Sequence, residues 1–240
     1  MDLYYAPPEQ VRGDRITLVG EESAHLVRVM RKRAGEEILV ADGQGMAYTA
    51  ALVSIERRST TCRIVARHPE LNESPRRLTL AVGLPKNPSR FDVLVEKATE
   101  IGVARIIPLL THRTVRHTPR TERWQAIALA AMKQSLRSRL PRIDEPRTLG
   151  TLLEDLTPTA AAILHASDSV AALGALSADL GERPLVLVGP EGGFTDEELQ
   201  QAASAGCRPA SLGQRRLRTE TAAIAAAALL LLDPVGSGLP

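Results

Sequence analysis

The apolar pattern of this chain changes near residue 70, and this change restricts the possible folds most strongly. Up to residue 66, short apolar segments alternate with glycine and polar residues, which is typical of short strands. Between the first two of these segments, Leu26, Val29 and Met30 recur at helical spacing, so one helix is predicted over Glu22 to Arg33. The pattern therefore predicts a small β-barrel with one basic helix on its rim, and its strands are expected at residues 16–19, 37–41, 47–55 and 62–66.

Beyond a polar, proline-containing linker at residues 68–77, apolar runs alternate with longer helical patterns. This alternation predicts an α/β domain with a mainly parallel sheet. Gly102 is expected to end one helix, and Thr195 with Glu198 forms the T-x-x-E capping box that begins another. We expect two domains, residues 1–72 and 73–240; the second should have strands at 78–84, 105–110, 161–165 and 185–188 and helices at 90–101, 122–136 and from 195.

Positive charge is clustered, although the formal net charge is only +2. Residues 112–142 carry eight basic side chains against the single acid Glu122: Arg113, Arg116, Arg120, Arg123, Lys133, Arg137, Arg139 and Arg142. A second cluster consists of Arg28, Arg31, Lys32 and Arg33. Such clusters can attract phosphate, and a solvated helix face is the alternative. Aromatic residues make up only 2% of the chain, which argues against RNA binding through stacked aromatic platforms.

The cysteines and the apolar segments exclude several classes of protein. Cys62 and Cys207 lie far apart without metal-ligand spacing, which argues against a zinc site and a disulfide framework and favours a reducing cytoplasm. Residues 1–8 lack the basic and apolar regions of a signal peptide. The most apolar stretch, residues 222–232, is too short to span a bilayer and is expected to be a buried helix.

A glycine-rich turn, Val188-Gly-Pro-Glu-Gly-Gly-Phe194, follows an apolar strand directly and precedes a helix. Open α/β sheets bind ligands beyond the carboxyl ends of their strands, where glycine lets the backbone approach a ligand closely. The spacing matches neither a dinucleotide-binding fingerprint nor a P-loop, so it does not indicate NAD or ATP. The alternative is an ordinary tight turn.

A second turn, residues 211–222, places Arg218 just before an apolar helix. Arginine is unusual there because a helix amino terminus already carries partial positive charge, so an anionic or electron-rich group is expected nearby. Thr219 is the predicted N-cap of this helix. The alternative for Arg218 is a solvated side chain paired with Glu220.

Together these segments closely resemble the RsmE family, the SPOUT methyltransferases of uridine N3 in 16S ribosomal RNA. The resemblance rests on the two turns, on Lys86 with the K-A-T-E-I-G segment of residues 97–102, and on residues 134–141, which are similar to the family's Q-x-x-R-x-x-x-P segment. Residues 25–31 and Asp42-Gly43 match the family's opening module. Lys133 and Ser135-Leu136 depart from the family pattern, in which Glu usually precedes the glutamine and Cys-Gly follows it.

The resemblance implies an N-terminal PUA-like β-barrel that binds RNA and a C-terminal SPOUT α/β domain with a trefoil knot. It implies a homodimer that acts on 16S rRNA or the 30S ribosomal subunit, with S-adenosylmethionine as cofactor and with no metal or membrane. The cofactor is expected between the two turns, with Leu164 completing the pocket. The implied cofactor residues are Leu164, Gly189, Pro190, Glu191, Gly192, Gly193, Leu212, Gly213, Leu217, Thr219, Glu220, Thr221 and Ala222.

Methylation at uracil N3 requires loss of a proton and stabilisation of the resulting negative charge, for which an arginine is well suited. Arg218, Arg137 and Arg139 are the candidates, and each could instead hold phosphate. Glu191 and Glu220 are the acids in the motifs, and neither can be chosen as the general base from the sequence. The predicted RNA-binding residues are His25, Arg28, Arg31, Lys32, Lys86, Arg113 and Gln134.

Two alternatives stay open at this stage. A SPOUT enzyme could act on another RNA, such as a transfer RNA or 23S rRNA. A protein without catalytic activity could keep the fold for ribosome assembly, although two intact cofactor turns argue against it.

Overall fold

The computed structural model describes residues 2–115, 120–156, 160–166 and 170–232, without the side chain of Arg28. Arg116, one of the clustered arginines, lies outside the described residues. The chain forms two compact units: residues 1–73 with 129–140, and residues 74–128 with 141–240. Each unit is described by itself below.

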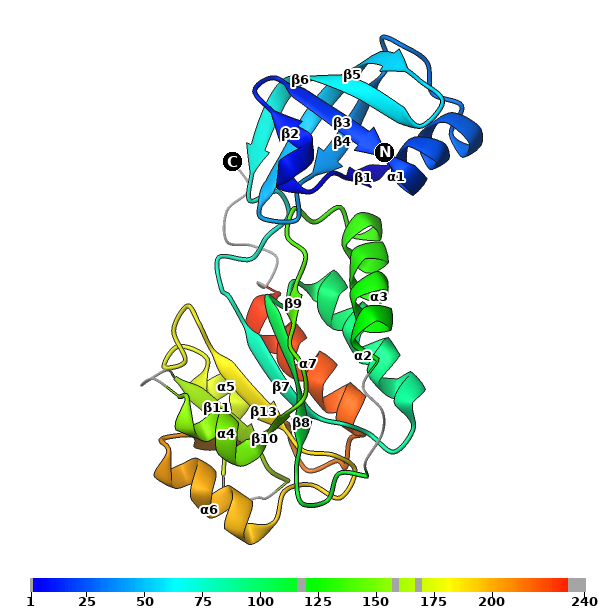
Figure 1. Ribbon diagram of the computed structural model, residues 1–240. Helices are drawn as coiled ribbons and strands as arrows, with labels where there is room; N and C mark the ends of the chain where they lie inside the picture. The colour runs from blue at the N-terminus through cyan, green and yellow to red at the C-terminus, as the bar shows by residue number, and fades with distance from the viewer. Residues whose placement is uncertain (1, 116–119, 157–159, 167–169, 233–240) are drawn as a thin grey trace. The chain divides into compact units, whose positions relative to one another are not determined.

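The first unit is built on a mixed six-stranded sheet in the order β1-β4-β5-β6-β3-β2 (Figure 1). β1 and β4 pair in parallel, and the other neighbours are antiparallel. The inward side chains, among them Ile16, Leu18, Ile38 and Val40, form a buried apolar core. The strands are β1 (Leu3–Tyr5), β2 (Val11–Arg12), β3 (Arg15–Val19), β4 (Glu37–Ala41), β5 (Met46–Ile55) and β6 (Ser59–Pro69), so β1 and β2 come in addition to the four predicted strands.

The helix of the first unit is shorter than predicted. It comprises α1 (Gly20–Ala24) and a π-helical turn (His25–Val29), in which the Met30 amide donates to the His25 carbonyl at 3.1 Å. Arg31 adopts a φ of +53°, a left-handed conformation that cannot continue a helix. The basic residues 31–33 therefore follow the helix instead of belonging to it.

Residues 129–140 complete the first unit. They include the end of α3 (Thr121–Gln134), and Met132 is fully buried in an apolar cluster with Leu3, Leu39, Ala41 and Ala47. Ser138 and Arg139 continue the contact, because the Gly45 amide donates to the Ser138 carbonyl and Gly43 forms a bridge with Arg139. Residues distant in sequence thus belong to one core.

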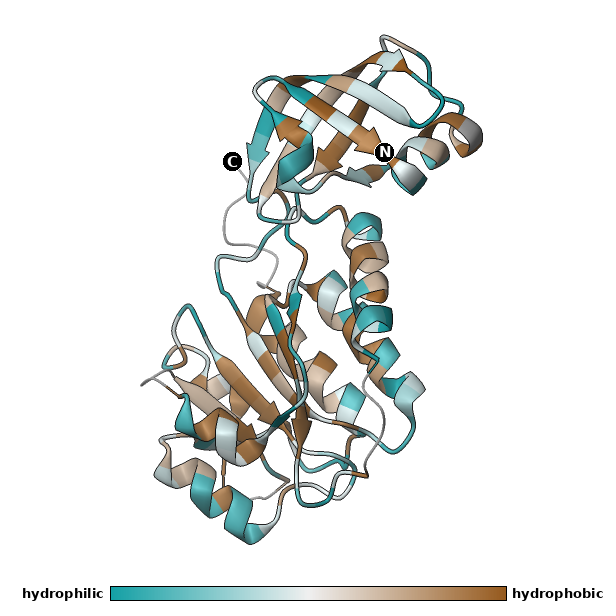
Figure 2. Cartoon of the chain, in the orientation of Figure 1, coloured by the Kyte–Doolittle hydropathy of each residue, from teal (hydrophilic) through white to brown (hydrophobic). Residues whose placement is uncertain are grey.

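The second unit is an α/β structure whose sheet is entirely parallel in its described pairings, in the order β10-β8-β7-β13-β11-β14-β12 with β9 beside β8. Its central strands are continuous apolar runs, as expected for a parallel sheet buried on both faces (Figure 2). The strands are β7 (Thr79–Gly83), β8 (Arg105–Leu110), β9 (Arg142–Ile143), β10 (Arg147–Thr148), β11 (Ala161–Leu164), β12 (Ala171–Ala172), β13 (Leu185–Val188) and β14 (Arg208–Ser211).

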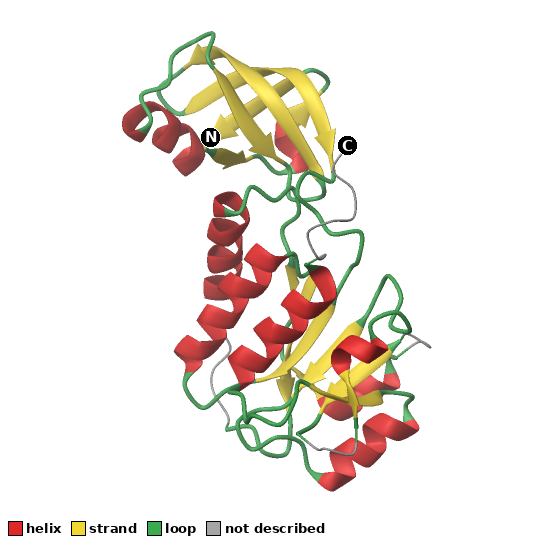
Figure 3. Ribbon diagram, turned by 180° about the vertical axis from the view of Figure 1, so that it is seen from behind, coloured by secondary structure: helices red, strands yellow, loops and turns green. Residues whose placement is uncertain are grey.

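Helices cover both faces of this sheet. α2 (Pro88–Ile101) lies alongside α7 (Thr219–Leu231), which packs on β7 and β13, and these helices lie in front of the sheet in Figure 3. α4 (Leu149–Glu154) and α6 (Asp196–Ser204) share an apolar cluster with β7, β8, β11 and β13 on the other face. The short α5 (Leu173–Leu176) contacts α7 and β14. No helix of the described chain is long and apolar enough to cross a membrane.

The helix ends test three sequence predictions. Gly102 ends α2 with a φ of +113°, and Thr195 and Glu198 form the reciprocal capping box of α6, so both predictions are confirmed. The prediction of Thr219 as the N-cap of α7 is wrong. Arg218 occupies the N-cap position without a side-chain cap, and Thr219 is the first helical residue.

Candidate functional site

A cavity of about 400 Å³ lies at the carboxyl ends of three adjacent strands in the second unit. Leu164, Val188 and Ser211 are the last residues of β11, β13 and β14, and each begins a lining segment. This is where open α/β sheets bind ligands. The lining residues are Arg113, Leu164, His165, Ala166, Val188, Gly189, Pro190, Glu191, Gly192, Gly193, Phe194, Ser211, Leu212, Gly213, Gln214, Arg215, Arg216, Leu217, Thr219 and Ala222.

The first turn of the cavity depends on glycine at several positions. Gly193 has a φ of +70°, and its amide donates to the Pro190 carbonyl at 2.8 Å. A Cβ on Gly189 would lie 3.0 Å from the Gly193 backbone. A Cβ on Gly83, at the end of β7, would lie 2.5 Å from the Pro190 nitrogen. The tight path of this turn thus leaves no room for side chains at Gly83 and Gly189.

The second turn contacts the first through Thr219. The Thr219 hydroxyl, buried within the unit, donates to the Gly189 carbonyl at 3.1 Å. At the start of this turn the Gly213 amide donates to the Ser211 hydroxyl at 3.0 Å, and Gly213 has a φ of +102°. Thr219 is the first helical residue of α7, so its hydroxyl joins the two turns and does not cap the helix.

Two arginines bind the carbonyl oxygens of the glycine-rich turn. Arg113 donates to the carbonyls of Gly192 and Phe194, and Arg216 donates to the Glu191 carbonyl at 3.2 Å. A Cβ on Gly192 would lie 3.1 Å from the Arg113 Cδ. These contacts hold the turn open toward the cavity while satisfying its backbone acceptors.

The Glu191 carboxylate is fixed by a residue that sequence reasoning missed. Arg90, on the first turn of α2, donates to Glu191 at 3.1 Å, and its Nε lies 3.7 Å from a carboxylate oxygen of Glu220. The Lys86 backbone amide also donates to Glu191, at 3.2 Å. The second carboxylate oxygen of Glu220 is buried without a hydrogen-bond partner among the described residues. An arginine on the polar side of an amphipathic helix gave no sequence signal that distinguished Arg90 from a solvated residue.

Eleven of the thirteen predicted cofactor residues line the cavity, and Glu220 and Thr221 do not. Glu220 lies beside Arg90, and Thr221 is exposed. The structure adds lining residues that were not predicted, including His165, Val188, Phe194 and Ser211. Val188 and Ser211 could have been found from their places at the ends of the two turns.

The three candidate catalytic arginines have different surroundings. Arg218 is exposed at the start of α7 and has no side-chain partner among the described residues. In the first unit, Arg137 is 2% exposed and pairs with Glu73 at 2.7 Å. Arg139 forms a bidentate pair with Glu70, and this hydrogen bonding raises the pKa of Arg139. Carboxylates thus occupy Arg137 and Arg139, whereas Arg218 is available.

The predicted RNA-binding residues fall in both units. His25, Arg31 and Gln134 are exposed in the first unit, and Lys32 there pairs with Glu36 at 3.0 Å. Hydrogen bonding from Lys32 lowers the pKa of Glu36. In the second unit the Lys86 side chain is exposed, and Arg113 lines the cavity. The Arg28 side chain is not among the described parts of the chain.

The buried thiols do not fit a nucleophilic role. Burial raises the pKa of Cys62 and of Cys207 to about 11, so both stay protonated at neutral pH. Among the described residues, no three histidine, cysteine, aspartate or glutamate side chains gather as metal ligands would.

Family models match both parts of the chain. An RNA methyltransferase domain matches residues 72–231, and an RNA methyltransferase PUA domain matches residues 18–65. The chain belongs to the RNA methyltransferase family. Ribosomal RNA small subunit methyltransferase E of Synechocystis is 36% identical over 90% of this chain and 72% of its own length. The Bacillus subtilis protein of the same name is 30% identical over 86% of this chain and 85% of its own length.

Solved structures of methyltransferases are also similar to this chain. Ribosomal RNA small subunit methyltransferase E from Neisseria gonorrhoeae, bound to S-adenosyl methionine, is 32% identical with a TM-score of 0.85 and 95% coverage of both chains. A methyltransferase from Legionella pneumophila in complex with the same cofactor is 30% identical with a TM-score of 0.79, covering 95% of this chain and 96% of its own. The resemblance to the RsmE family and the predicted fold class, PUA-like followed by SPOUT-like α/β, are thereby confirmed.

Proposed function

We propose that this chain uses S-adenosylmethionine to methylate N3 of a uridine in 16S rRNA. The observation that carries the proposal is the pair of turns at one cavity, joined by the bond from the Thr219 hydroxyl to the Gly189 carbonyl. Relatives that are 36% and 30% identical to this chain are named as small-subunit rRNA methyltransferases. A scaffold protein without catalytic activity would not require both turns.

The residues of the cavity fit S-adenosylmethionine. The volume of about 400 Å³ lies within the usual range for small-molecule sites. Leu164, Leu212 and Leu217 offer apolar surface for the adenine, and the glycine-rich turns let backbone groups approach it. When bound, the cofactor supplies an electrophilic methyl group. The trefoil knot is part of the proposal, supported by the contact between the two turns.

The protein's own groups must expose the base and stabilise its anion. N3 lies on the Watson–Crick edge, so the uridine has to be unpaired or extruded before it reacts. Leu217 and Thr219 line the cavity whereas Arg218 between them does not, so Arg218 is free to face the uracil oxygens. Its guanidinium would donate hydrogen bonds to the oxygens on which negative charge develops.

The proton on N3 needs an acceptor. Glu191, which lines the cavity, and Glu220 both lie beside Arg90. We assign Arg90 the role of orienting these two carboxylates. Substitution of each carboxylate in turn would identify which of them accepts the proton.

RNA binding and catalysis are divided between domains in this proposal. Residues 1–72 would bind rRNA through His25, Arg28, Arg31 and Lys32, and residues 73–240 would carry the methyltransferase. Lys86, Arg113 and Gln134 are further proposed RNA contacts, and Arg137 and Arg139 remain secondary candidates for charge stabilisation. We also propose that the activity is cytoplasmic, as expected for an enzyme that acts on ribosomal RNA.

We also propose that the chain is a homodimer. Apolar side chains are exposed along the second turn and α7. Leu217 in the turn, Leu229 in α7 and Leu232 directly after α7 are 37%, 46% and 59% exposed. Burial of such side chains against a second copy would be favourable. Light scattering of the purified protein should give twice the mass of one chain, and a monomer at micromolar concentration would contradict this part of the proposal.

Methylation mapping tests the function. Ribosomes from a strain that lacks this protein should have lost one N3-methyluridine in the small-subunit rRNA, and the purified protein with S-adenosylmethionine should restore it. Restoration on a transfer RNA or 23S rRNA instead would assign another substrate. Failure of the protein to bind the cofactor in calorimetric titration would support an assembly factor.

A further inference from the structure

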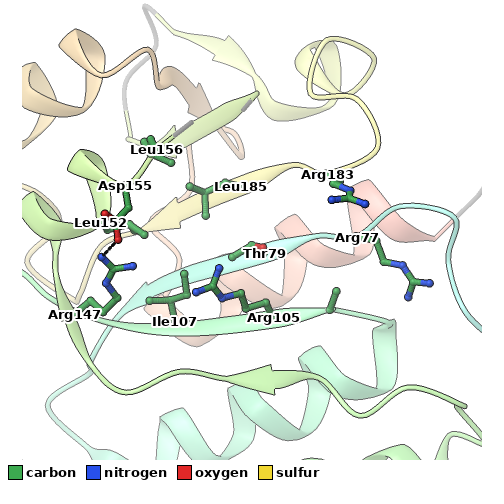
Figure 4. Close-up of a pocket in the computed structure, with 11 residues that line it drawn as sticks. Arg77, Thr79, Arg105, Ile107, Arg147, Leu152, Asp155, Leu156, Arg183 and Leu185 are labelled. Carbon is green, nitrogen blue, oxygen red and sulfur yellow. Dashed lines mark hydrogen bonds and ion pairs between the residues drawn. The ribbon is translucent and has the colours of Figure 1, made fainter. Parts of the chain in front are cut away.

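A second cavity in the second unit, of about 440 Å³, is lined by four arginines. They are Arg77, Arg105, Arg147 and Arg183, and we call the cavity the arginine pocket. Figure 4 shows them around a floor that includes Thr79, Ile107 and Leu185, with Arg147 beside Asp155 at one end. No motif of the sequence and no part of the proposed reaction accounts for this cluster.

Strand register explains how the arginines come together. Leu185, Thr79 and Arg105 are neighbours in one row across β13, β7 and β8. Arg147 begins the next strand, β10, where it lies beside Leu109 near the carboxyl end of β8, while Arg77 and Arg183 each precede a strand by two residues. Since adjacent strands are about 4.8 Å apart, the four strands span roughly 14 Å across the sheet, and the offset of four residues from Arg105 to Leu109 adds roughly 13 Å along it. Leu152 of α4 and Leu156, which follows α4, close one side of the pocket.

The charges of the pocket are only partly compensated. Asp144 binds Arg105, and the largely exposed Asp155 binds Arg147. Arg183 is exposed and has no hydrogen-bond or ion-pair partner among the described residues. Each guanidinium has five donors, so the paired arginines keep donors available after binding one carboxylate. Arg183 and the remaining donors of Arg105 and Arg147 thus leave an excess of positive charge and of hydrogen-bond donors in the pocket.

The arginine pocket is distinct from the cofactor cavity. It lies toward the amino ends of β7, β8 and β13, whereas the cofactor cavity lies beyond the carboxyl ends of β11, β13 and β14. The two cavities share no lining residue. A five-residue strand such as β7 is about 17 Å long, so a ligand in the pocket would be remote from the methyl group.

We propose that the arginine pocket binds backbone phosphates of the RNA substrate, at a position remote from the methylated base. Arginine suits this role because its planar fork binds phosphate oxygens in pairs. A span of roughly 14 Å is longer than a single phosphate and suits successive phosphates along one strand. The proposal rests on the proposed function, since it takes the RNA substrate as the ligand.

The test compares the full-length protein with the double variant Arg147→Gln/Arg183→Gln. These positions are chosen because their loss removes only one ion pair, that of Arg147 with the exposed Asp155, whereas Arg105 belongs to a network in which it shares the buried Asp144 with Arg142. Arg208→Gln is the matched control, because Arg208 is an exposed arginine of the same sheet outside the pocket. Binding of a fluorescent small-subunit rRNA fragment with the target uridine is measured by anisotropy at several salt concentrations.

The double variant should bind this RNA roughly tenfold more weakly, and the slope of log affinity against log salt should fall by about two. Its KM for RNA should rise while kcat at saturating RNA, the melting temperature and the affinity for S-adenosylmethionine stay the same. The control should match the wild type. Methyl transfer by the wild type in the same assay tests the proposed function separately.

Two results would overturn the proposal. One is RNA affinity and salt slope equal to the wild type, or reduced as much by the Arg208 control. The other is that the wild type binds inorganic triphosphate and the double variant does not, while the double variant keeps full affinity for RNA. That result would assign the pocket to a free anion.

Discussion

Arg218 and Thr219 are consecutive residues with opposite environments. Thr219 is buried and joins the two turns, while Arg218 is exposed and lies outside the lining of the cofactor cavity. The sequence correctly drew attention to an arginine at a helix amino terminus, where its charge is unfavourable. We propose that the positive charge of Arg218 at this position stabilises the anion of the uracil base.

Arg218→Ala should therefore separate catalysis from cofactor binding. Turnover should fall roughly a hundredfold or more, the usual loss on removal of a donor to a developing anion. Calorimetry should show an almost unchanged dissociation constant for S-adenosylmethionine. Arg218→Lys should restore only part of the rate, because a point charge does not reproduce the planar guanidinium. Lost cofactor affinity with retained turnover would instead assign Arg218 to the structure of the turn.

Gly83 tests whether the tight packing of the first turn matters. Gly83→Ala places a Cβ about 2.5 Å from the Pro190 nitrogen, so the turn must move. We expect a loss of about 1–3 kcal/mol in stability from overpacking and a cofactor affinity roughly tenfold lower. Gly150→Ala is the matched control, since nothing lies within 4 Å of its Cβ position on α4. Equal melting temperatures and cofactor affinities for the two variants would contradict this account.

At the level of elements, the spacing of apolar residues and the cap residues predicted most of the long helices and strands. β4, β8 and β13 have the predicted bounds, and α6 begins at its predicted cap. Short elements such as β9, β10 and β12 were missed, because two residues hold no periodic signal. The cap was misplaced by one residue, because the local rule recognises a suitable residue type, here Thr219, and does not determine at which residue the helix begins.

The segment that follows α3 offers a test of the role of Arg137. The buried Arg137 and Glu73 are each 2% exposed, so Glu73→Gln leaves the guanidinium without its carboxylate. We expect a loss of about 3 kcal/mol, measured by urea unfolding. The double variant Arg137→Met/Glu73→Leu should recover part of this stability, because it removes both charges but also the acceptor of the Arg139 backbone amide.

The same double variant distinguishes structure from catalysis. If Arg137 only anchors the segment, the double variant keeps its turnover per folded molecule. A fall of a hundredfold in kcat with restored stability would instead support the sequence-based prediction that Arg137 is catalytic.

For the whole molecule, the sequence indicated a change of architecture near residue 70 but gave no sign that residues 129–140 return to the first unit. Met132 and Leu136 lie at ordinary helical and turn positions in the sequence, and only the tertiary structure shows them packed with Leu3 and Leu39. Interactions between residues distant in sequence have no periodic signature. The domain that residues 1–72 would form in isolation therefore lacks part of the core seen here.

Truncation tests this directly. Residues 1–73 alone should fail to unfold cooperatively, because removal of residues 129–140 exposes the cluster around Met132 and takes away the partner of Glu73. Attaching residues 129–140 through a flexible Gly/Ser linker of about 20 residues should restore a sigmoidal thermal transition by circular dichroism. In that fused form Met132→Asp, which buries a charge, should abolish the transition. A cooperative transition of residues 1–73 alone at the same temperature as the fused form would show that this domain folds without residues 129–140. The fused form should also bind rRNA with an affinity that falls as salt rises, since exposed basic residues such as Arg31 would contact phosphate.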